Sequence, residues 1–120
     1  MSVPYLLDEH IAHAYRVQLL RRDSAMIVWT IGDPGAPPTA APDPDALRWC
    51  EAHGFILITN NRKSMPRHLR DHLARGGHVP GMFQLDPEKR MAEILDELIL
   101  IERASFEHEY RDRIVYLPMT

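Results

Sequence analysis

The sequence predicts an α/β fold in which helices cover both faces of a mostly parallel sheet, giving three layers in the order α/β/α. Short apolar, β-branched segments alternate along the chain with segments whose apolar residues recur at helical spacing. The apolar segments are nearly continuous, which is typical of strands covered on both faces. Alternation of strand and helix favours parallel strands joined by right-handed crossovers. At 120 residues the chain is long enough to bury one core, so we expect a single domain over residues 1–120.

The first third of the chain predicts two strands around one helix. Val3–Leu7 is a short apolar strand that ends at Asp8. Glu9–Arg22 has apolar residues at helical spacing and ends in two arginines, which suit the negative end of the helix dipole. Ala25–Ile31 is rich in β-branched and apolar residues and predicts a second buried strand.

Residues 32–44 form the main break in the pattern. This stretch holds five of the ten prolines, and we expect a mobile surface loop. It is not a linker between domains, because each flank is too small to fold alone. Asp43 is a natural N-cap and Pro44 fits the first helical position, so a helix is predicted from here to about His53. Gly54 then ends that helix.

The middle of the chain continues the alternation. Phe55–Thr59 predicts a buried strand, and Pro66 fits the first turn of a helix that reaches Arg75. Two glycines end that helix. Val79–Leu85 predicts a weaker strand that is interrupted at its start by a proline and a glycine.

The last part of the chain predicts one long helix, one short helix and a final strand. Asp86-Pro87-Glu88 is a helix start, and the apolar periodicity continues to about Ala104. Ser105 caps a predicted short helix over Phe106–Arg111. Ile114–Leu117 closes the chain as a strand.

Composition excludes several classes of protein. The net charge of −3 excludes a broadly basic coat for nucleic acid, although a local basic patch remains open. Cys50 is the one cysteine, so no disulfide forms within the chain and no cysteine cluster binds zinc; a reducing, cytoplasmic location is expected. No apolar run is long enough to span a membrane, and the N-terminus lacks the pattern of a secretory signal.

Polar residues that follow predicted strands carry the functional hypothesis. Ligands of open α/β sheets bind beyond the carboxyl ends of the strands. Asp8 and Asn61 follow two such strands, and Asp45 lies at the start of the helix on the same rim, so these three are expected to converge. Clustered carboxylates repel one another unless a cation lies between them, and their oxygens suit Mg²⁺ or Mn²⁺. Arg62 and Lys63 stand beside this cleft and suit contacts with phosphate.

Each of these residues also has a purely structural interpretation. Asp8 serves equally well as an N-cap, and Asp43 is better explained as a cap than as a ligand because Pro44 follows it. Asp45 complements the helix dipole, and Asn61 suits a turn. The basic residues from 62 to 75 are most simply a solvated helix face.

Six stretches, spread over nearly the whole chain, carry a resemblance to a known family. They are LLDEH at the start, DPDALRWCEAHGFILITNN in the middle, KSMPRHL and GHVPGMF after it, and LDELILIERA and IVYLP toward the end. In this order they resemble the small, mostly uncharacterised bacterial PIN-like proteins, a family related to the PIN-domain ribonucleases of toxin–antitoxin pairs.

This resemblance implies a PIN-like α/β/α fold and an acidic, Mg²⁺-dependent ribonuclease site. Asp8 matches the acid that ends the first strand, and Asp45 matches the acid at the start of the middle helix. Asn61 stands where relatives usually carry an aspartate, and Lys63 stands where many have a second acid. An amide still offers an oxygen to a metal but removes a negative charge, so weaker metal binding and lower or absent cleavage are expected. In related families the apolar helix faces serve a homodimer or an antitoxin-like protein.

Two other functions compete with the ribonuclease. A catalytically inactive PIN-like module would bind RNA or a protein partner without turnover, as the loss of acids at Asn61 and Lys63 indicates. A receiver-like phosphoacceptor domain would need an aspartate after the third strand, where this chain has Thr59, Asn60 and Asn61. Since an amide cannot accept the phosphoryl group in that chemistry, the receiver interpretation is disfavoured. In the ribonuclease hypothesis, Glu9 is expected to act through a bound water.

Overall fold

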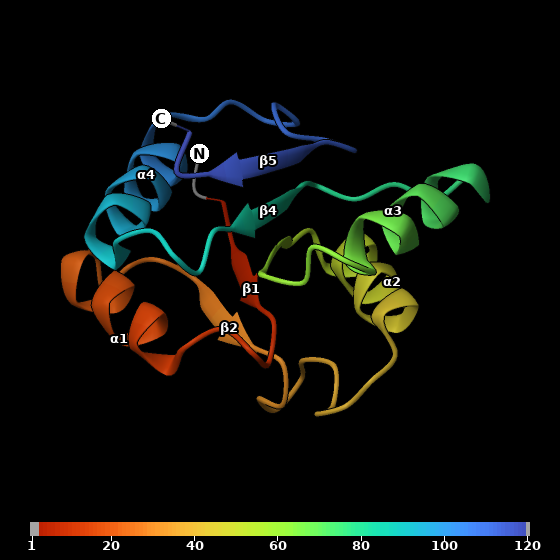
Figure 1. Cartoon of the computed structure of the whole chain (residues 1–120), viewed down its shortest axis with the longest axis horizontal. Coiled ribbons are helices and arrows are strands. Elements are labelled where there is room, and N and C mark those ends of the chain that lie inside the picture. Colours follow the sequence, from red (N-terminus) through yellow and green to blue (C-terminus); the bar gives the residue numbers. More distant parts are fainter. Residues whose placement is uncertain (1–2, 120) are drawn as a thin grey trace.

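The structure, a computed structural model that describes residues 3–119, contains a single five-stranded sheet among those residues, with all neighbouring strands parallel (Figure 1). The strands lie in the order β2-β1-β3-β4-β5. Their bounds are β1 Tyr5–Leu7, β2 Val28–Thr30, β3 Ile56–Thr59, β4 Met82–Leu85 and β5 Ile114–Leu117. The predicted α/β class with a parallel sheet is confirmed.

Four helices cover the two faces of the sheet in the described chain, which completes the three predicted layers (Figure 1). Their bounds are α1 His13–Arg22, α2 Asp43–His53, α3 Met65–Ala74 and α4 Met91–Ala104. Successive strand residues face opposite sides. Tyr5 and Leu7 therefore pack with α1 and α4, whereas Leu6 packs with α2 and α3. The Tyr5 hydroxyl donates a hydrogen bond to the Leu98 carbonyl (2.8 Å), which ties the central strand to α4.

Cys50 belongs to the core on the α2 and α3 face. Its side chain is completely buried beneath α2, among apolar residues of the sheet. Burial disfavours the charged thiolate and raises the pKa of Cys50 to about 12. The thiol therefore acts as a small apolar side chain here.

Two predicted helix starts are wrong, and local turns explain both. The first helix was expected from Glu9 but begins at His13, because the Asp8 N–H continues the sheet ladder to Ile58 and the Ile11 N–H closes a turn on the Asp8 carbonyl. The fourth helix was expected from Asp86 but begins at Met91. The Asp86 carboxylate accepts the Glu88 N–H instead and closes a turn over residues 86–89.

The predicted short helix over residues 106–111 is absent from the structure, which has turns there. Ser105 ends α4, and its hydroxyl donates back to the Ile101 carbonyl, so it caps nothing that follows. His108 and Asp112 adopt positive φ values of 65° and 61°, which a helix cannot contain. The final strand, Ile114–Leu117, is confirmed.

The start of α2 differs from the prediction by one position. Pro42 precedes the helix and Asp43 is its first residue, so the prediction of Asp43 as N-cap is wrong. No side chain caps this helix, and the Asp43 carboxylate is free to contact a neighbouring element. Gly54 ends α2 in the left-handed conformation (φ 76°), as predicted.

The strand order places a crevice at one point of the sheet. From β1 the chain adds β2 on one side and later returns to add β3 on the other. The connections that leave β1 and β3 therefore run to opposite faces, and this reversal opens a crevice at their carboxyl ends, where ligands of such sheets bind. Asp8 follows β1 and Asn61 follows β3 at this point.

None of the helices formed by residues 3–119 has the length and apolar character needed to cross a membrane.

Candidate functional site

Asp8 is a buried carboxylate at the crevice, with only 7% of its surface exposed. Its Oδ2 accepts the Thr59 hydroxyl (2.8 Å), and its Oδ1 accepts the Glu9 N–H (2.8 Å). Among the ion pairs of the described residues, none joins Asp8 to a lysine, arginine or histidine. A buried carboxylate without a positive partner carries a desolvation cost that a bound cation would offset.

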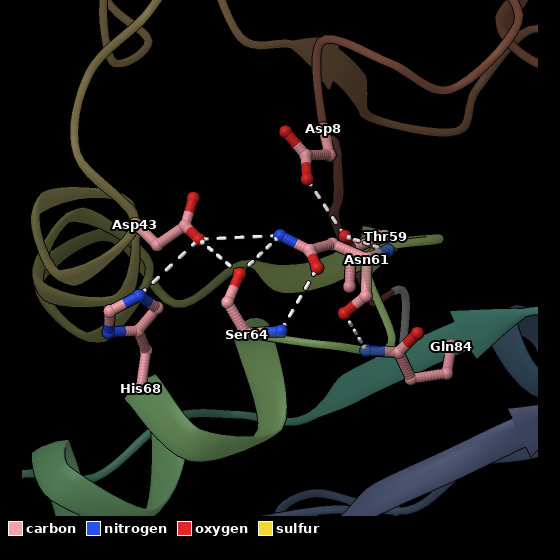
Figure 2. Close-up of polar contacts among 7 residues, drawn as sticks. All are labelled: Asp8, Asp43, Thr59, Asn61, Ser64, His68 and Gln84. Carbon is pink, nitrogen blue, oxygen red and sulfur yellow. Dashed lines mark hydrogen bonds and ion pairs between the residues drawn. The ribbon is translucent and has the colours of Figure 1, made fainter.

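Asn61 connects this carboxylate to α2 and α3 (Figure 2). Its N–H donates to Thr59 Oγ1 (3.1 Å), the same hydroxyl that donates to Asp8. Its side-chain oxygen accepts the Ser64 N–H (3.1 Å). A backbone N–H only donates, so this contact assigns the oxygen and leaves the amide NH₂ facing Asp43 Oδ2 (3.5 Å) and Ser64 Oγ (2.7 Å).

Asp43 receives donors from α3 on one of its two oxygens. Besides the Asn61 amide, Oδ2 lies 3.4 Å from Ser64 Oγ and 3.7 Å from His68 Nε2. In Figure 2 the other carboxylate oxygen of Asp43 makes none of the drawn contacts and points away from them. Asp43 and Asp8 are thus joined through Asn61 and Thr59, across the carboxyl end of β3.

Asp45 lies on a different side of α2. It forms an ion pair with Arg48, and its side chain is 48% exposed. No hydrogen bond or ion pair among the described residues joins it to Asp8 or Asn61. Two residues along a helix turn the side chain by roughly 200°, so Asp43 and Asp45 cannot face the same cleft. Of the three residues expected to converge, the structure connects Asp8 with Asn61 and brings Asp43, rather than Asp45, to them.

Arg62 and Lys63 lie in the loop between Asn61 and α3. The Arg62 guanidinium is half-exposed and lies 3.4 Å from the Asp86 carboxylate. Lys63 is exposed. Both cations therefore stand beside the crevice and remain accessible to an anionic ligand.

Glu9 connects the turn after β1 to the proline-rich segment, residues 32–42. Its Oε1 accepts the Ala40 N–H (3.0 Å). Within the same segment, the Gly32 N–H donates to the Pro37 carbonyl (2.8 Å), and the Trp49 indole of α2 donates to the Gly35 carbonyl (3.0 Å). This segment therefore forms one wall beside Asp8 and α2, and Glu9 has a structural partner.

The donor set fits a divalent cation only in part. Within residues 3–119, no three histidine, cysteine, aspartate or glutamate side chains are arranged to hold a metal ion. Mg²⁺ is commonly held by one or two carboxylates and keeps several waters. Asp8 and Asp43 are the two carboxylates that the hydrogen bonds of this crevice connect. The Asn61 oxygen already accepts the Ser64 N–H, and its NH₂ faces the Asp43 carboxylate, so the side chain presents a hydrogen-bond donor to that carboxylate in this arrangement.

Two large hollows lie elsewhere on the surface of the described residues. One, of about 530 Å³, is lined by the amino-terminal ends of the strands and by the turns after α4. The other, of about 660 Å³, lies between α2 and α3 and reaches His68. Neither is lined by Asp8 or Asn61.

Sequence reasoning did not select Ser64, His68 or Gln84. Ser64 directly precedes α3, and His68 lies four residues later on the helix, a spacing that predicts a shared partner once the neighbouring helix is known. Gln84 lies in β4, and its Nε2 donates to the Asn61 carbonyl (3.0 Å). A glutamine within an otherwise apolar strand is the feature of the sequence that could have drawn attention to Gln84.

Comparison of this chain with family models, with curated proteins and with solved structures finds no match in any of the three.

Proposed function

We propose that this chain is a divalent-cation-dependent phosphodiesterase that acts on RNA, of the PIN-like type, and that Asp8 and Asp43 hold the cation. The burial of Asp8 without a positive partner is the observation that carries this proposal. Asp43 supports it, because it supplies a second carboxylate from the other side of Asn61. The resemblance to PIN-like proteins favours RNA as the substrate and an antitoxin-like protein as a regulator.

The residues around Asp8 and Asp43 have distinct roles in this proposal. Bound Mg²⁺ or Mn²⁺ would supply an activated water and stabilise the leaving oxygen of a phosphodiester. Ser64 and His68 orient Asp43 through its Oδ2. Thr59 orients Asp8 by donating its hydroxyl. Arg62 and Lys63 bind the phosphates on either side of the cleaved bond.

The test compares three carboxylate variants. Mn²⁺ binding is measured by calorimetry, and cleavage of a labelled single-stranded RNA is followed on gels. Asp8→Asn and Asp43→Asn are each expected to lower Mn²⁺ affinity by about tenfold or more and to abolish cleavage. Asp45→Asn is the matched control, because it removes the same charge from the same helix turn on its exposed side.

The outcomes separate the parts of the proposal. Wild-type protein that neither binds Mn²⁺ nor cleaves RNA overturns it. If Asp45→Asn loses as much affinity as Asp43→Asn, the sequence-based choice of Asp45 is correct and the assignment of Asp43 fails. Equal, small effects of all three variants show that the cation lies elsewhere.

A non-catalytic RNA-binding module is the second candidate. The NH₂ group of Asn61 faces Asp43, where a hydrolytic site of this kind needs negative charge. This candidate predicts that the wild-type chain binds RNA without cleaving it, even in excess Mn²⁺. Sustained cleavage that disappears in Asp8→Asn excludes it.

A further inference from the structure

A row of polar side chains extends from the crevice to the edge of the sheet. Leu7 pairs with Ile58, so Asp8 stands level with Thr59; Thr59 pairs with Gln84, and Gln84 pairs with Tyr116. Residues level with one another in neighbouring strands project to the same face. That face is the one covered by α2 and α3, because residues two positions earlier in β1, β3 and β4 belong to its core.

The burial of this row ends before the last strand, β5. Thr59 and Gln84 are buried, but the side chain of Tyr116 is 56% exposed. Tyr116 therefore presents its ring to solvent at the open end of a row that begins at Asp8. A single exposed aromatic residue is ordinary on a protein surface, so its exposure alone does not indicate a binding role. The residues around Tyr116 provide the further evidence.

Gln84, the neighbour of Tyr116 in this row, has a polar atom without a partner. Only 1% of the residue is exposed, and among the described residues its Oε1 accepts no hydrogen bond. The amide cannot be turned over to correct this, because Nε2 is needed to donate to the Asn61 carbonyl. The row therefore contains an unused acceptor, at Gln84, between Thr59 and Tyr116.

Arg62 supplies positive charge at the same edge of the sheet. Its guanidinium lies 3.4 Å from Asp86, and the Asp86 N–H donates to the carbonyl of Leu117, the residue after Tyr116. The cation is thus anchored just beyond β4, at a residue that is hydrogen-bonded to the end of β5. An accessible cation and an exposed aromatic ring at one edge of a sheet are the combination that binds single-stranded nucleic acid, through phosphate and base respectively.

We infer that Tyr116 is a base-stacking subsite for single-stranded RNA, at the outer end of the row Asp8, Thr59, Gln84 and Tyr116. The inference rests on the proposed function, because it places the base a short distance along the strand from the phosphate at Asp8. At about 4.8 Å per strand, the row spans roughly 14 Å, which a few nucleotides of an extended strand cover. Arg62 contacts an intervening phosphate. Duplex RNA does not fit, since a base within a duplex has both faces stacked on its neighbours.

The experiment measures affinity separately from cleavage. Fluorescence anisotropy gives the dissociation constant of a labelled, phosphorothioate single-stranded RNA for the full chain in Mg²⁺. Tyr116→Ala is expected to weaken binding by about tenfold. Tyr116→Phe keeps the ring and is expected to bind as wild type does. Leu100→Ala, which truncates an equally exposed apolar residue on α4, is the matched control and is expected to change nothing.

A second arm uses the RNA instead of the protein. An oligonucleotide with one abasic position, moved along the strand, is expected to lose affinity for the wild-type chain at one register. The same loss is expected to be absent with Tyr116→Ala, because the stacking partner is already missing.

The outcomes distinguish failure of the stacking subsite from failure of the proposed function. If the wild-type chain does not bind RNA, the proposed function and the subsite fail together. If wild type binds and Arg62→Ala weakens binding while Tyr116→Ala does not, the subsite alone is wrong. If Tyr116→Ala leaves RNA affinity unchanged but abolishes self-association in sedimentation, this edge is a protein interface, which also overturns the subsite.

Discussion

The orientation of one amide decides what the candidate site can bind. Asn61 presents its NH₂ group to Asp43 because the Ser64 N–H requires its oxygen. A hydrogen-bond donor thus stands where the resemblance to PIN-like proteins predicts a third carboxylate. The proposed cation site therefore has two acids and one competing donor, which predicts weak binding of a divalent cation.

Asn61→Asp is expected to strengthen the cation site. One oxygen of the new carboxylate still accepts the Ser64 N–H, and the other replaces the donor that faces Asp43. Without a cation the two like charges repel, which lowers the free energy of unfolding by about 1 kcal/mol. Mn²⁺ affinity is expected to rise about tenfold, as measured by calorimetry.

Asn60→Asp provides the control for this prediction, since it adds the same charge one residue earlier, where the amide reaches only the His10 carbonyl. Unchanged Mn²⁺ affinity in Asn61→Asp would mean that position 61 does not face the bound ion.

Sequence alone led to two of the three residues at the crevice. Asp8 and Asn61 follow strands, and in a parallel sheet the carboxyl ends of the strands lie on one edge. The choice between Asp43 and Asp45 depended on the rotation of α2 about its axis. That rotation is set by packing of Ala46, Leu47 and Cys50 against the sheet, which no local pattern of charges reveals.

At the scale of whole elements, a second polar cluster joins the amino-terminal ends of the strands to the helices. Glu51 of α2 accepts the His78 N–H (2.9 Å) and lies 2.7 Å from His72 of α3. His78 in turn lies 2.7 Å from Asp112, just before β5. The hydrogen bond from the His78 N–H, followed by that from His72, lowers the pKa of Glu51 below its ordinary value of 4.5.

The lowered pKa predicts how acid weakens this cluster. A carboxyl group whose pKa is lower in the folded chain stabilises the fold above its ordinary pKa, and that contribution disappears as the pH falls through the folded value. Glu51→Gln is therefore expected to lower the free energy of unfolding near neutral pH. Its difference from wild type is expected to shrink below pH 4.5, the ordinary value for the group.

Urea unfolding at a series of pH values measures this difference. Glu93→Gln, a change of an exposed glutamate on α4, is the control and is expected to follow the wild-type curve. A difference between Glu51→Gln and wild type that grows on acidification would contradict the prediction. His72 and His78 gain charge over part of the same range, so both remain unchanged in all three proteins.

Element boundaries were predicted less well than element types. Every strand and long helix was expected from apolar pattern, because burial on both faces leaves a strong signal. Asp86-Pro87 signals a helix start, yet its N–H is committed to Leu117 and its carboxylate to a turn, so α4 starts at Met91. The hydrogen bond to Leu117 comes from a strand that is distant in the sequence, so the local pattern around Asp86 does not reveal it.

At the scale of the whole molecule, the proposed cation site predicts a local cost to stability. If Asp8 holds a cation, its burial without a positive partner is expected to destabilise the cation-free fold. Asp8→Asn is therefore expected to unfold at a higher temperature than wild type when divalent cations are removed with a chelator.

Addition of Mn²⁺ is expected to reverse this order. A ligand at 100 times its dissociation constant stabilises the folded chain by about 2.7 kcal/mol, and only the protein with the intact site gains this. Thermal unfolding followed by circular dichroism, with and without Mn²⁺, measures both effects. An equal gain for wild type and Asp8→Asn would place the stabilising ion at another site.

Cys50 has a practical consequence for anyone who handles this protein. It is the one thiol in the chain, and it is buried between α2 and the sheet. Burial raises its pKa, so the reactive thiolate is scarce. Oxidants and alkylating reagents act on the accessible anion, so they cannot modify the folded chain at this position. A disulfide-linked dimer on a non-reducing gel would therefore come from chains that had unfolded, and not from a native assembly.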